Sequence, residues 1–191
     1  MPILAFDTAQ QACSAAISHD GELLASRRRL IQRGHAEQLL PMIEDVRQQA
    51  GVEFRNLDLI AVTIGPGTFT GVRVGLAAAR ALALVHDLAM LGVGTLELLA
   101  QGAVQNRPAA TEAEIGDGII AAIDARRGEL YTQAFDGAGR PLTDATVGPA
   151  DPALAAAAAA PGLLIGTGAL LMQDILPDCR VVDKDAQPGA G

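Results

Sequence analysis

Two aspartates at the ends of apolar segments are the residues best placed to do chemistry. Asp7 follows the apolar residues 3–6 and Asp124 follows residues 119–123, so each is expected at the end of a buried strand. Two carboxylates placed in this way, one in each of two lobes, could organise a magnesium ion and phosphate groups. Alternatively, each aspartate begins a turn and binds nearby backbone N–H groups.

A glycine-rich segment between an expected strand and an expected helix is the most specific local pattern. The sequence GPGTFTGVR, residues 65–73, follows the apolar residues 59–64 and opens a helix of small and aliphatic residues. A helix N-terminus attracts anions, so a phosphate site is one interpretation. However, the spacing departs from the dinucleotide fingerprint, the Gly-Lys-Ser/Thr of a P-loop is missing, and Pro66 removes one N–H. Because Phe69 would also fill the space of a phosphate, we favour a shaped turn that serves packing.

The remaining side chains give little support for a catalytic site. His19, His35 and His86 are far apart and lack the i, i+4 spacing of a zinc-binding pair. Cys13 lies within a strand pattern, and the sequence shows no Ser/His/Asp or Cys/His arrangement. We therefore predict no catalytic residues and no metal site, and a scaffold rather than an enzyme.

Composition narrows the range of partners. The 191 residues are 50% hydrophobic and 19% charged, which suits a compact core or two small lobes. With 14 basic and 22 acidic residues the net charge is −8, so direct binding of nucleic acid is not expected. Two cysteines fit a reducing cytosol. No signal peptide opens the sequence, and Arg80 and Asp87 interrupt the apolar residues 72–93, so we expect a cytoplasmic protein without a membrane span.

The hydrophobic pattern predicts an α/β fold with two lobes. Strands are expected at residues 3–6, 13–18, 22–30 and 59–64, and helices at 35–50, 71–85 and 95–105. After a polar, acidic stretch at residues 106–118, an apolar strand ending in Asp recurs, followed by hairpin strands and short helices. We predict an N-terminal lobe of residues 1–106 and a smaller, truncated C-terminal lobe of residues 107–191. Each lobe is expected to be a mixed sheet flanked by helices.

The helix expected at residues 71–85 has a face with almost no side chain. Gly71, Gly75 and Ala79 lie four residues apart and so share one face. Such a face allows another element to approach closely, and Val72 and Leu76 add apolar area beside it. The opposite face is scarcely polar either, which is typical of a helix buried on more than one side. Its neighbours are either parts of the same domain or, as we predict, partly another subunit.

Four segments together resemble the bacterial TsaB proteins. They are ILAFDTA at residues 3–9, HAEQLLPMI at 35–43, GPGTFTGVR at 65–73 and AIDARRGELY at 122–131. The resemblance implies two ribonuclease-H-like lobes of the actin and hexokinase type. It also implies an inactive relative of TsaD, which transfers threonylcarbamoyl to the adenosine beside the anticodon of certain tRNAs. TsaD holds its metal through two histidines of a helix where this chain has His35 and Leu39, so the resemblance implies no metal here.

The same resemblance implies partners and cofactors. TsaD is the expected partner, with TsaE in the assembled complex, and a homodimer is expected when TsaD is absent. The chain is expected to need no cofactor of its own, with ATP and magnesium on TsaD, and to be required for tRNA modification without binding tRNA directly.

Two sets of residues are candidates for binding. We predict that docking uses the helices at residues 35–50 and 71–85, through His35, Leu39, Leu40, Ile43, Gly71, Val72, Gly75, Leu76 and Ala79. Asp7 and Thr8 are candidates for a nucleotide or phosphate contact. A small-molecule kinase or ATPase of the same fold is the alternative function.

Overall fold

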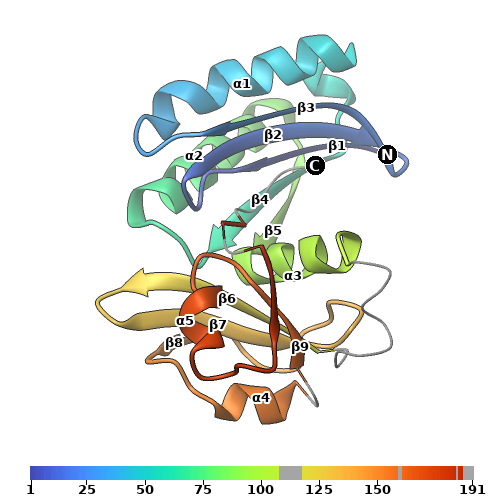
Figure 1. Cartoon of the computed structure of the whole chain (residues 1–191). Coiled ribbons are helices and arrows are strands. Elements are labelled where there is room, and N and C mark those ends of the chain that lie inside the picture. The colour runs from blue at the N-terminus through green and yellow to red at the C-terminus, as the bar shows by residue number, and fades with distance from the viewer. Residues whose placement is uncertain (108–117, 159–160, 184, 187–191) are drawn as a thin grey trace. The chain divides into compact units, whose positions relative to one another are not determined.

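The described residues form two compact units. The computed structural model describes residues 1–107, 118–158, 161–183 and 185–186. Its units are Met1–Thr95 and Leu96–Gln187, drawn in Figure 1. The division therefore lies before the helix that follows Thr95, whereas the sequence pattern placed it after residue 106. The reason is packing, because the apolar residues of that helix, among them Leu96 and Leu99, lie in the core of the second unit.

The first unit is a five-stranded mixed sheet with two helices against it (Figure 1). Its elements are β1 (Pro2–Asp7), β2 (Ala12–His19), β3 (Glu22–Leu30), α1 (His35–Ala50), η1 (Phe54–Asn56), β4 (Leu59–Gly65), α2 (Phe69–His86) and β5 (Ala89–Gly94). The strand order is β3-β2-β1-β4-β5. The first three strands of the chain pair antiparallel, whereas β1, β4 and β5 run parallel.

The core of this unit forms where both helices meet one face of the sheet. Leu4 and Phe6 of β1 and Ile60 of β4 belong to this core, and alternate residues of a strand share a face. Four residues of α1 at helical spacing pack onto them: Leu39, Met42, Ile43 and Val46. The helix ends at Gly51, whose φ of 66° lies in the left-handed region that favours glycine. Burial of each large apolar side chain contributes roughly 1.5–3 kcal/mol.

α2 packs against the sheet through its smallest residues. Thr68 caps the start of the helix, where its hydroxyl oxygen accepts a hydrogen bond from the Gly71 N–H at 3.1 Å. The buried residues of α2 are Gly71, Gly75 and Ala79, so the small-residue face is turned toward the unit's own sheet. A Cβ atom at Gly75 would lie 2.8 Å from the hydroxyl oxygen of Thr8, the residue that follows β1. This leaves no room for a larger side chain at position 75.

The other apolar residues of α2 are half-buried against the core, as Val74, Leu76 and Leu82 are, or exposed. α2 is the helix that, among the described residues, is long and apolar enough to cross a membrane by length and composition alone. One such helix is weak evidence of a membrane span, since a core helix of a soluble protein passes the same test. Within this single chain only 17% of the 18-residue helix is buried, so the first unit covers one side of α2, and cover of the other side by a second subunit stays a prediction.

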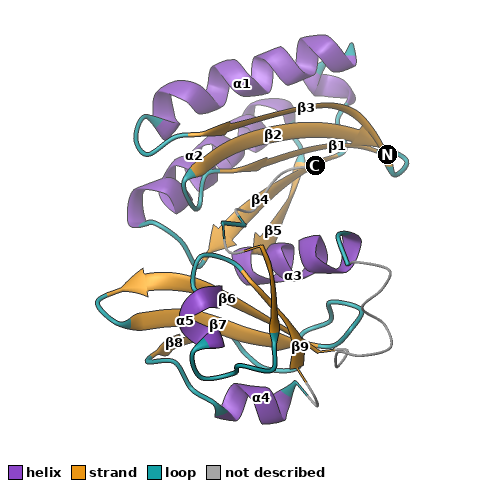
Figure 2. Cartoon of the chain, viewed as in Figure 1, coloured by secondary structure: helices purple, strands orange, loops and turns teal. Residues whose placement is uncertain are grey.

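The second unit repeats the topology of the first with shorter helices (Figure 2). Its elements are α3 (Thr95–Gln105), β6 (Gly118–Arg126), β7 (Glu129–Phe135), β8 (Thr146–Gly148), α4 (Ala153–Ala157), β9 (Pro161–Ile165), α5 (Ala169–Gln173) and β10 (Arg180–Asp183). The strand order is β10-β9-β6-β7-β8, with β6 antiparallel to β7 and parallel to β9. The predicted internal repeat and the two α/β lobes are thereby confirmed.

Two apolar clusters fill the second unit, one on each face of its sheet. α3 packs with Ile119, Ala121 and Ile123 of β6. The alternate β6 residues Ile120 and Ala122 pack with residues of α4 and α5. Successive residues of β6 point to opposite faces of the sheet, and both faces are buried. Residues 119–123 are therefore continuously apolar.

We predict that Gly75→Leu destabilises the first unit by about 2 kcal/mol, because a leucine must displace Thr8 or tilt α2. Ala77→Leu is the matched control, since Ala77 is exposed on the same helix and should change the free energy of unfolding by less than about 0.5 kcal/mol. Urea unfolding followed by circular dichroism measures both. Equal stability of the two variants would show that the contact between Gly75 and the sheet is loose.

Candidate functional site

The carboxyl end of β1 carries a buried carboxylate. The side chain of Asp7 is 1% exposed. Its Oδ1 accepts hydrogen bonds from the Ala9 N–H at 3.0 Å and from the Thr63 hydroxyl. Its Oδ2 is also buried and has no hydrogen-bond partner among the described residues. Burial raises the pKa of Asp7 to about 6, although the hydrogen bonds from Thr63 and Ala9 and the charge of Arg28 lower it.

The glycine-rich turn joins this strand end to α2 by close backbone contacts. The Thr8 hydroxyl donates to the Gly71 carbonyl at 2.7 Å, and the Thr68 N–H donates to the Ala9 carbonyl at 2.7 Å. A Cβ atom at Gly71 would lie 2.0 Å from the Thr8 carbonyl oxygen, and one at Gly67 would lie 2.4 Å from that of Ala9. Only glycine permits this approach, so the turn serves packing as predicted.

Three of the backbone donors that a phosphate could use are already bonded within the protein. The N–H groups of Thr68, Gly71 and Val72 bind Ala9, the Thr68 side chain and the Thr68 carbonyl, respectively. The hydroxyl of Thr8, a candidate phosphate contact, is bonded to Gly71. The turn therefore offers an incoming phosphate none of these three N–H groups unless its own packing is broken.

Asp124, at the matching position in the second unit, has a different environment. It is exposed, and its Oδ1 accepts a hydrogen bond from the Arg126 N–H at 2.7 Å. Arg126 and Arg127 have φ values of 67° and 60°, and Gly128 completes the turn between β6 and β7. Asp124 thus organises a turn, which is the alternative stated for it above.

The structure places His35 at the start of α1. Its Nε2 lies 3.0 Å from the Gln10 carbonyl oxygen. Among the residues that the structure describes, no group of three or more His, Cys, Asp and Glu side chains is placed to hold a metal ion.

The predicted docking residues fall into two groups. Five are buried inside the first unit: Leu39, Ile43, Gly71, Gly75 and Ala79. The other four are half-buried or exposed: His35, Leu40, Val72 and Leu76. The prediction that the small-residue face meets a partner therefore needs correction, because that face packs on the unit's own sheet. A side chain that already fills the core cannot also line a docking surface.

The outer face of α2 lies opposite the small-residue face, and none of its residues was among the predicted docking residues. We define it by residues that are all exposed: Phe69, Arg73, Ala77, Arg80, Ala81, Leu84 and Val85. Phe69, Leu84 and Val85 are 75%, 86% and 73% exposed. Helical periodicity places Arg73 and Ala77 opposite Gly71 and Gly75. The sequence would therefore have predicted the outer face if the buried side of α2 had been known.

Phe69 does not fill the turn, in contrast to the prediction. Its ring is exposed, and the guanidinium carbon of Arg73 lies 3.4 Å from the ring centroid. Arg73 Nη1 also donates a hydrogen bond to the Phe69 carbonyl at 3.0 Å. This cation–π contact, together with the hydrogen bond, holds an aromatic ring and an arginine side by side on the outer face of α2.

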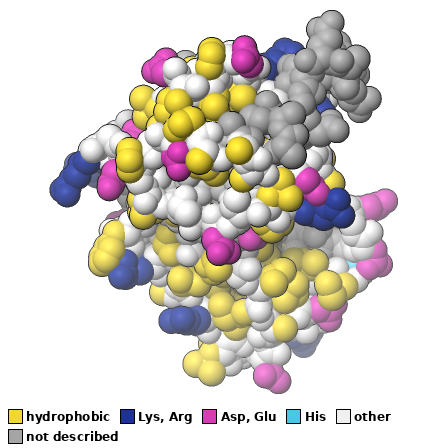
Figure 3. All heavy atoms as spheres, turned by 90° about the horizontal axis from the view of Figure 1, so that it is seen from below, with side chains coloured by type: hydrophobic (Ala, Val, Ile, Leu, Met, Phe, Trp, Pro, Cys, Tyr) yellow, Lys and Arg dark blue, Asp and Glu magenta, His cyan; other side chains and the backbone are white. Residues whose placement is uncertain are grey.

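The basic residues of β3 do not form a joint binding patch. Residues 27–29 alternate across the strand, so Arg28 faces the side opposite to Arg27 and Arg29. Arg29 Nη1 donates to Gln38 Oε1 at 2.7 Å, and Arg27 Nη1 donates to the Ser26 carbonyl. Figure 3 views the molecule from below and shows the described basic side chains of that face only, which lie apart from one another.

We predict that Asp7→Asn removes a pH dependence of stability. The folded protein keeps a proton on Asp7 up to about pH 6, whereas the unfolded chain loses it near the ordinary aspartate pKa of 3.8. Wild-type stability therefore falls as the pH rises through this window. Between about pH 5 and 7.5 the wild type should lose about 1–2 kcal/mol more than Asp7→Asn. Urea unfolding at both pH values measures this difference. Asp124→Asn, at an exposed turn, should behave as the wild type, and parallel curves for all three proteins would contradict the prediction.

Comparisons with known proteins match this chain to TsaD by a family model and to TsaB proteins by sequence identity. Residues 27–167 match the family model of TsaD, the tRNA N6-adenosine threonylcarbamoyltransferase. The chain is 43% identical over 131 residues to the tRNA threonylcarbamoyladenosine biosynthesis protein TsaB of Escherichia coli (strain K12), covering 69% of this chain and 53% of that protein. TsaB of Bacillus subtilis (strain 168) is 31% identical over 136 residues, 71% of this chain and 55% of that protein. The chain thus spans about half the length of the curated relatives it matches.

A solved structure covers nearly the whole chain. YeaZ from Pseudomonas aeruginosa is 34% identical and superposes with a TM-score of 0.82, over 99% of this chain and 86% of that protein. The family predicted from four sequence segments is confirmed. The chain belongs to the TsaB family of tRNA threonylcarbamoyladenosine biosynthesis proteins.

Proposed function

We propose that this chain is a non-catalytic subunit required for threonylcarbamoyl transfer to the anticodon-adjacent adenosine of tRNA. It would act by forming a heterodimer with a TsaD-type transferase and stabilising it. The names of its curated relatives support the pathway. The observation that carries the subunit role is the outer face of α2, an exposed apolar helix surface with Phe69 and Leu84 near its two ends.

The outer face of α2 has the composition of an interface. A partner that buries large apolar side chains gains about 25 cal/mol of binding free energy for each Å² of apolar surface removed from water. Aromatic residues and arginine dominate the binding energy of many protein interfaces. Phe69 and Arg73 are already held together, which lowers the entropy lost when a partner covers them. Leu40, which is 54% exposed on α1, remains a candidate for the same surface.

The contacts around Asp7 support a subunit without its own phosphate chemistry. The Thr8 hydroxyl and the N–H groups of Thr68, Gly71 and Val72 are bound to other protein groups. Asp124 is used in a turn. We therefore assign ATP and magnesium to the TsaD partner, and we place TsaE in the assembled complex.

The same proposal includes a homodimer of this chain in the absence of TsaD and a cytoplasmic location. When TsaD is absent, the outer face of α2 would be covered by a second copy of the chain. The net charge of −8 and the separated arginines of β3 support a role without direct tRNA contact. A tRNA-modifying complex of this kind would work in the cytoplasm.

We predict that Leu84→Asp weakens binding to the TsaD-type transferase of the same organism about 30-fold, the loss expected at an interface hot spot. Leu84 is 86% exposed, so the change should leave the fold intact. Leu23→Asp is the matched control, because Leu23 is 54% exposed on β3, away from α2, and should bind as the wild type. Isothermal titration calorimetry measures both. Wild-type affinity of Leu84→Asp and of Phe69→Asp would show that partners do not use the outer face of α2.

We further predict that reconstituted tRNA modification fails without this chain, while gel shifts of tRNA with the chain alone stay negative. The purified chain should also hydrolyse ATP at the background rate. Salt-sensitive tRNA binding by the chain alone, or full modification activity of the transferase without it, would refute the subunit role. ATP hydrolysis above background, abolished by Asp7→Asn, would instead support the small-molecule kinase or ATPase.

A further inference from the structure

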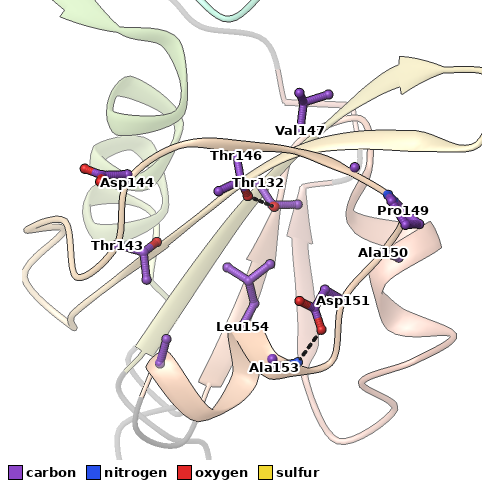
Figure 4. A pocket seen from close by; sticks show the side chains of 12 residues that line it. Thr132, Thr143, Asp144, Thr146, Val147, Pro149, Ala150, Asp151, Ala153 and Leu154 are labelled. Atoms are coloured by element: carbon purple, nitrogen blue, oxygen red, sulfur yellow. Dashed lines mark hydrogen bonds between the residues drawn. The ribbon is translucent and has the colours of Figure 1, made fainter.

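The second unit contains a pocket that the proposed function does not use. It has a volume of about 570 Å³ and lies between β7, β8 and α4, as Figure 4 shows. Small-molecule sites in proteins typically occupy about 300–1,000 Å³, so the volume suits a small organic ligand. The pocket lies wholly within one unit, and its lining residues come from β7, β8, α4 and the segments between them.

Neighbouring hydroxyl groups form one wall of the pocket. Thr132 of β7 is 5% exposed, and its Oγ1 lies 3.2 Å from Oγ1 of Thr146, its partner in β8 (Figure 4). Thr143 contributes a third hydroxyl, whose oxygen accepts a hydrogen bond from the Ala134 N–H at 3.1 Å. A hydroxyl can both donate and accept, so these groups suit a polar ligand head of either hydrogen-bonding type.

The charged residues that line the pocket determine which charge the polar head of a ligand can carry. Asp144 and Asp151 line the pocket, and none of the described lining residues is Lys, Arg or His. Asp151 Oδ1 accepts a hydrogen bond from the Ala153 N–H at 2.8 Å, which leaves its second oxygen for a ligand. The Leu154 N–H is bound to the Asp151 carbonyl, so the start of α4 does not offer these two donors to an anion. An anionic ligand would meet two carboxylates without a compensating cation.

An apolar wall faces the polar one. In Figure 4 the side chain of Leu154 points toward the threonine pair. Ala150 and Ala157 also line the pocket. Leu154 is half-buried and packs against the core cluster of β6, β7 and β9, so its position is supported from behind. A ligand with an apolar body could remain in contact with this wall while its head reaches the hydroxyl groups.

We infer that this pocket is a binding site for a small organic cation, an ammonium head on an apolar body. The head lies beside Asp151 within reach of the threonine hydroxyls, Asp144, whose carboxylate points away from them in Figure 4, adds negative charge at the rim, and the body packs on Leu154. The site is independent of the outer face of α2, which belongs to the other unit. Partner binding and ligand binding can therefore fail separately.

Three probes of matched shape test the inference: benzylamine, benzyl alcohol and benzoate. Each is titrated into the ¹⁵N-labelled full chain, and amide shifts are followed by two-dimensional NMR. Benzylamine should shift the amides of Thr146, Asp151 and Ala153 along a saturable curve, with weaker binding of benzyl alcohol and no saturable shift with benzoate. Benzoate binding at these amides, equal affinity of the alcohol and the amine, or the absence of a saturable shift with every probe would overturn the inference.

Matched variants tie the binding to the two carboxylates. The double change Asp144→Asn and Asp151→Asn should weaken benzylamine binding about five-fold, as expected for the loss of two exposed ion pairs. The asparagine oxygen at position 151 can still accept the hydrogen bond from the Ala153 N–H, so the fold should persist, and the spectrum of the variant verifies this. Asp174→Asn, at an exposed carboxylate outside the pocket, should bind as the wild type. Wild-type affinity of the double variant would assign the shifts to non-specific contact.

Discussion

The close approach between the end of β1 and the start of α2 is the contact on which the first unit depends. It rests on the hydrogen bond from the Thr8 hydroxyl to the Gly71 carbonyl and on glycines at positions 67 and 71, where a Cβ atom would overlap backbone atoms. This contact sets how near α2 lies to the sheet. It thereby turns the small residues of α2 inward, leaves Phe69, Leu84 and Val85 exposed, and closes the space around Asp7.

The same closeness changes the chemistry of Asp7. A carboxylate at the end of β1 is removed from water, and its two hydrogen bonds reach only one of its oxygens among the described residues. Burial then disfavours the charged form and raises the pKa to about 6. The second unit repeats the strand order but not this environment, because Asp124 stays exposed in a turn. A repeated fold therefore does not imply a repeated site.

The two units expose different kinds of surface. The outer face of α2 presents apolar side chains with two arginines, which suits a large partner surface that can exclude water. The pocket beside β8 and α4 is small, acidic and lined by hydroxyl groups, which suits a small cation. Since each surface lies within its own unit, each would serve its own partner.

Local patterns alone determined the order of strands and helices, the repeat of an apolar strand ending in aspartate, and the four segments that identify the family. These depend on hydrophobic period and on residues adjacent in sequence. Only tertiary structure decided which side of α2 is buried, because helical periodicity groups Gly71, Gly75 and Ala79 on one face without stating what that face meets. The outward position of Phe69, the unpartnered oxygen of Asp7, the place of α3 in the second unit and the pocket lined by Thr132 and Thr146 likewise arise from contacts between distant segments. Such contacts depend on how whole elements pack, and no local spacing encodes them.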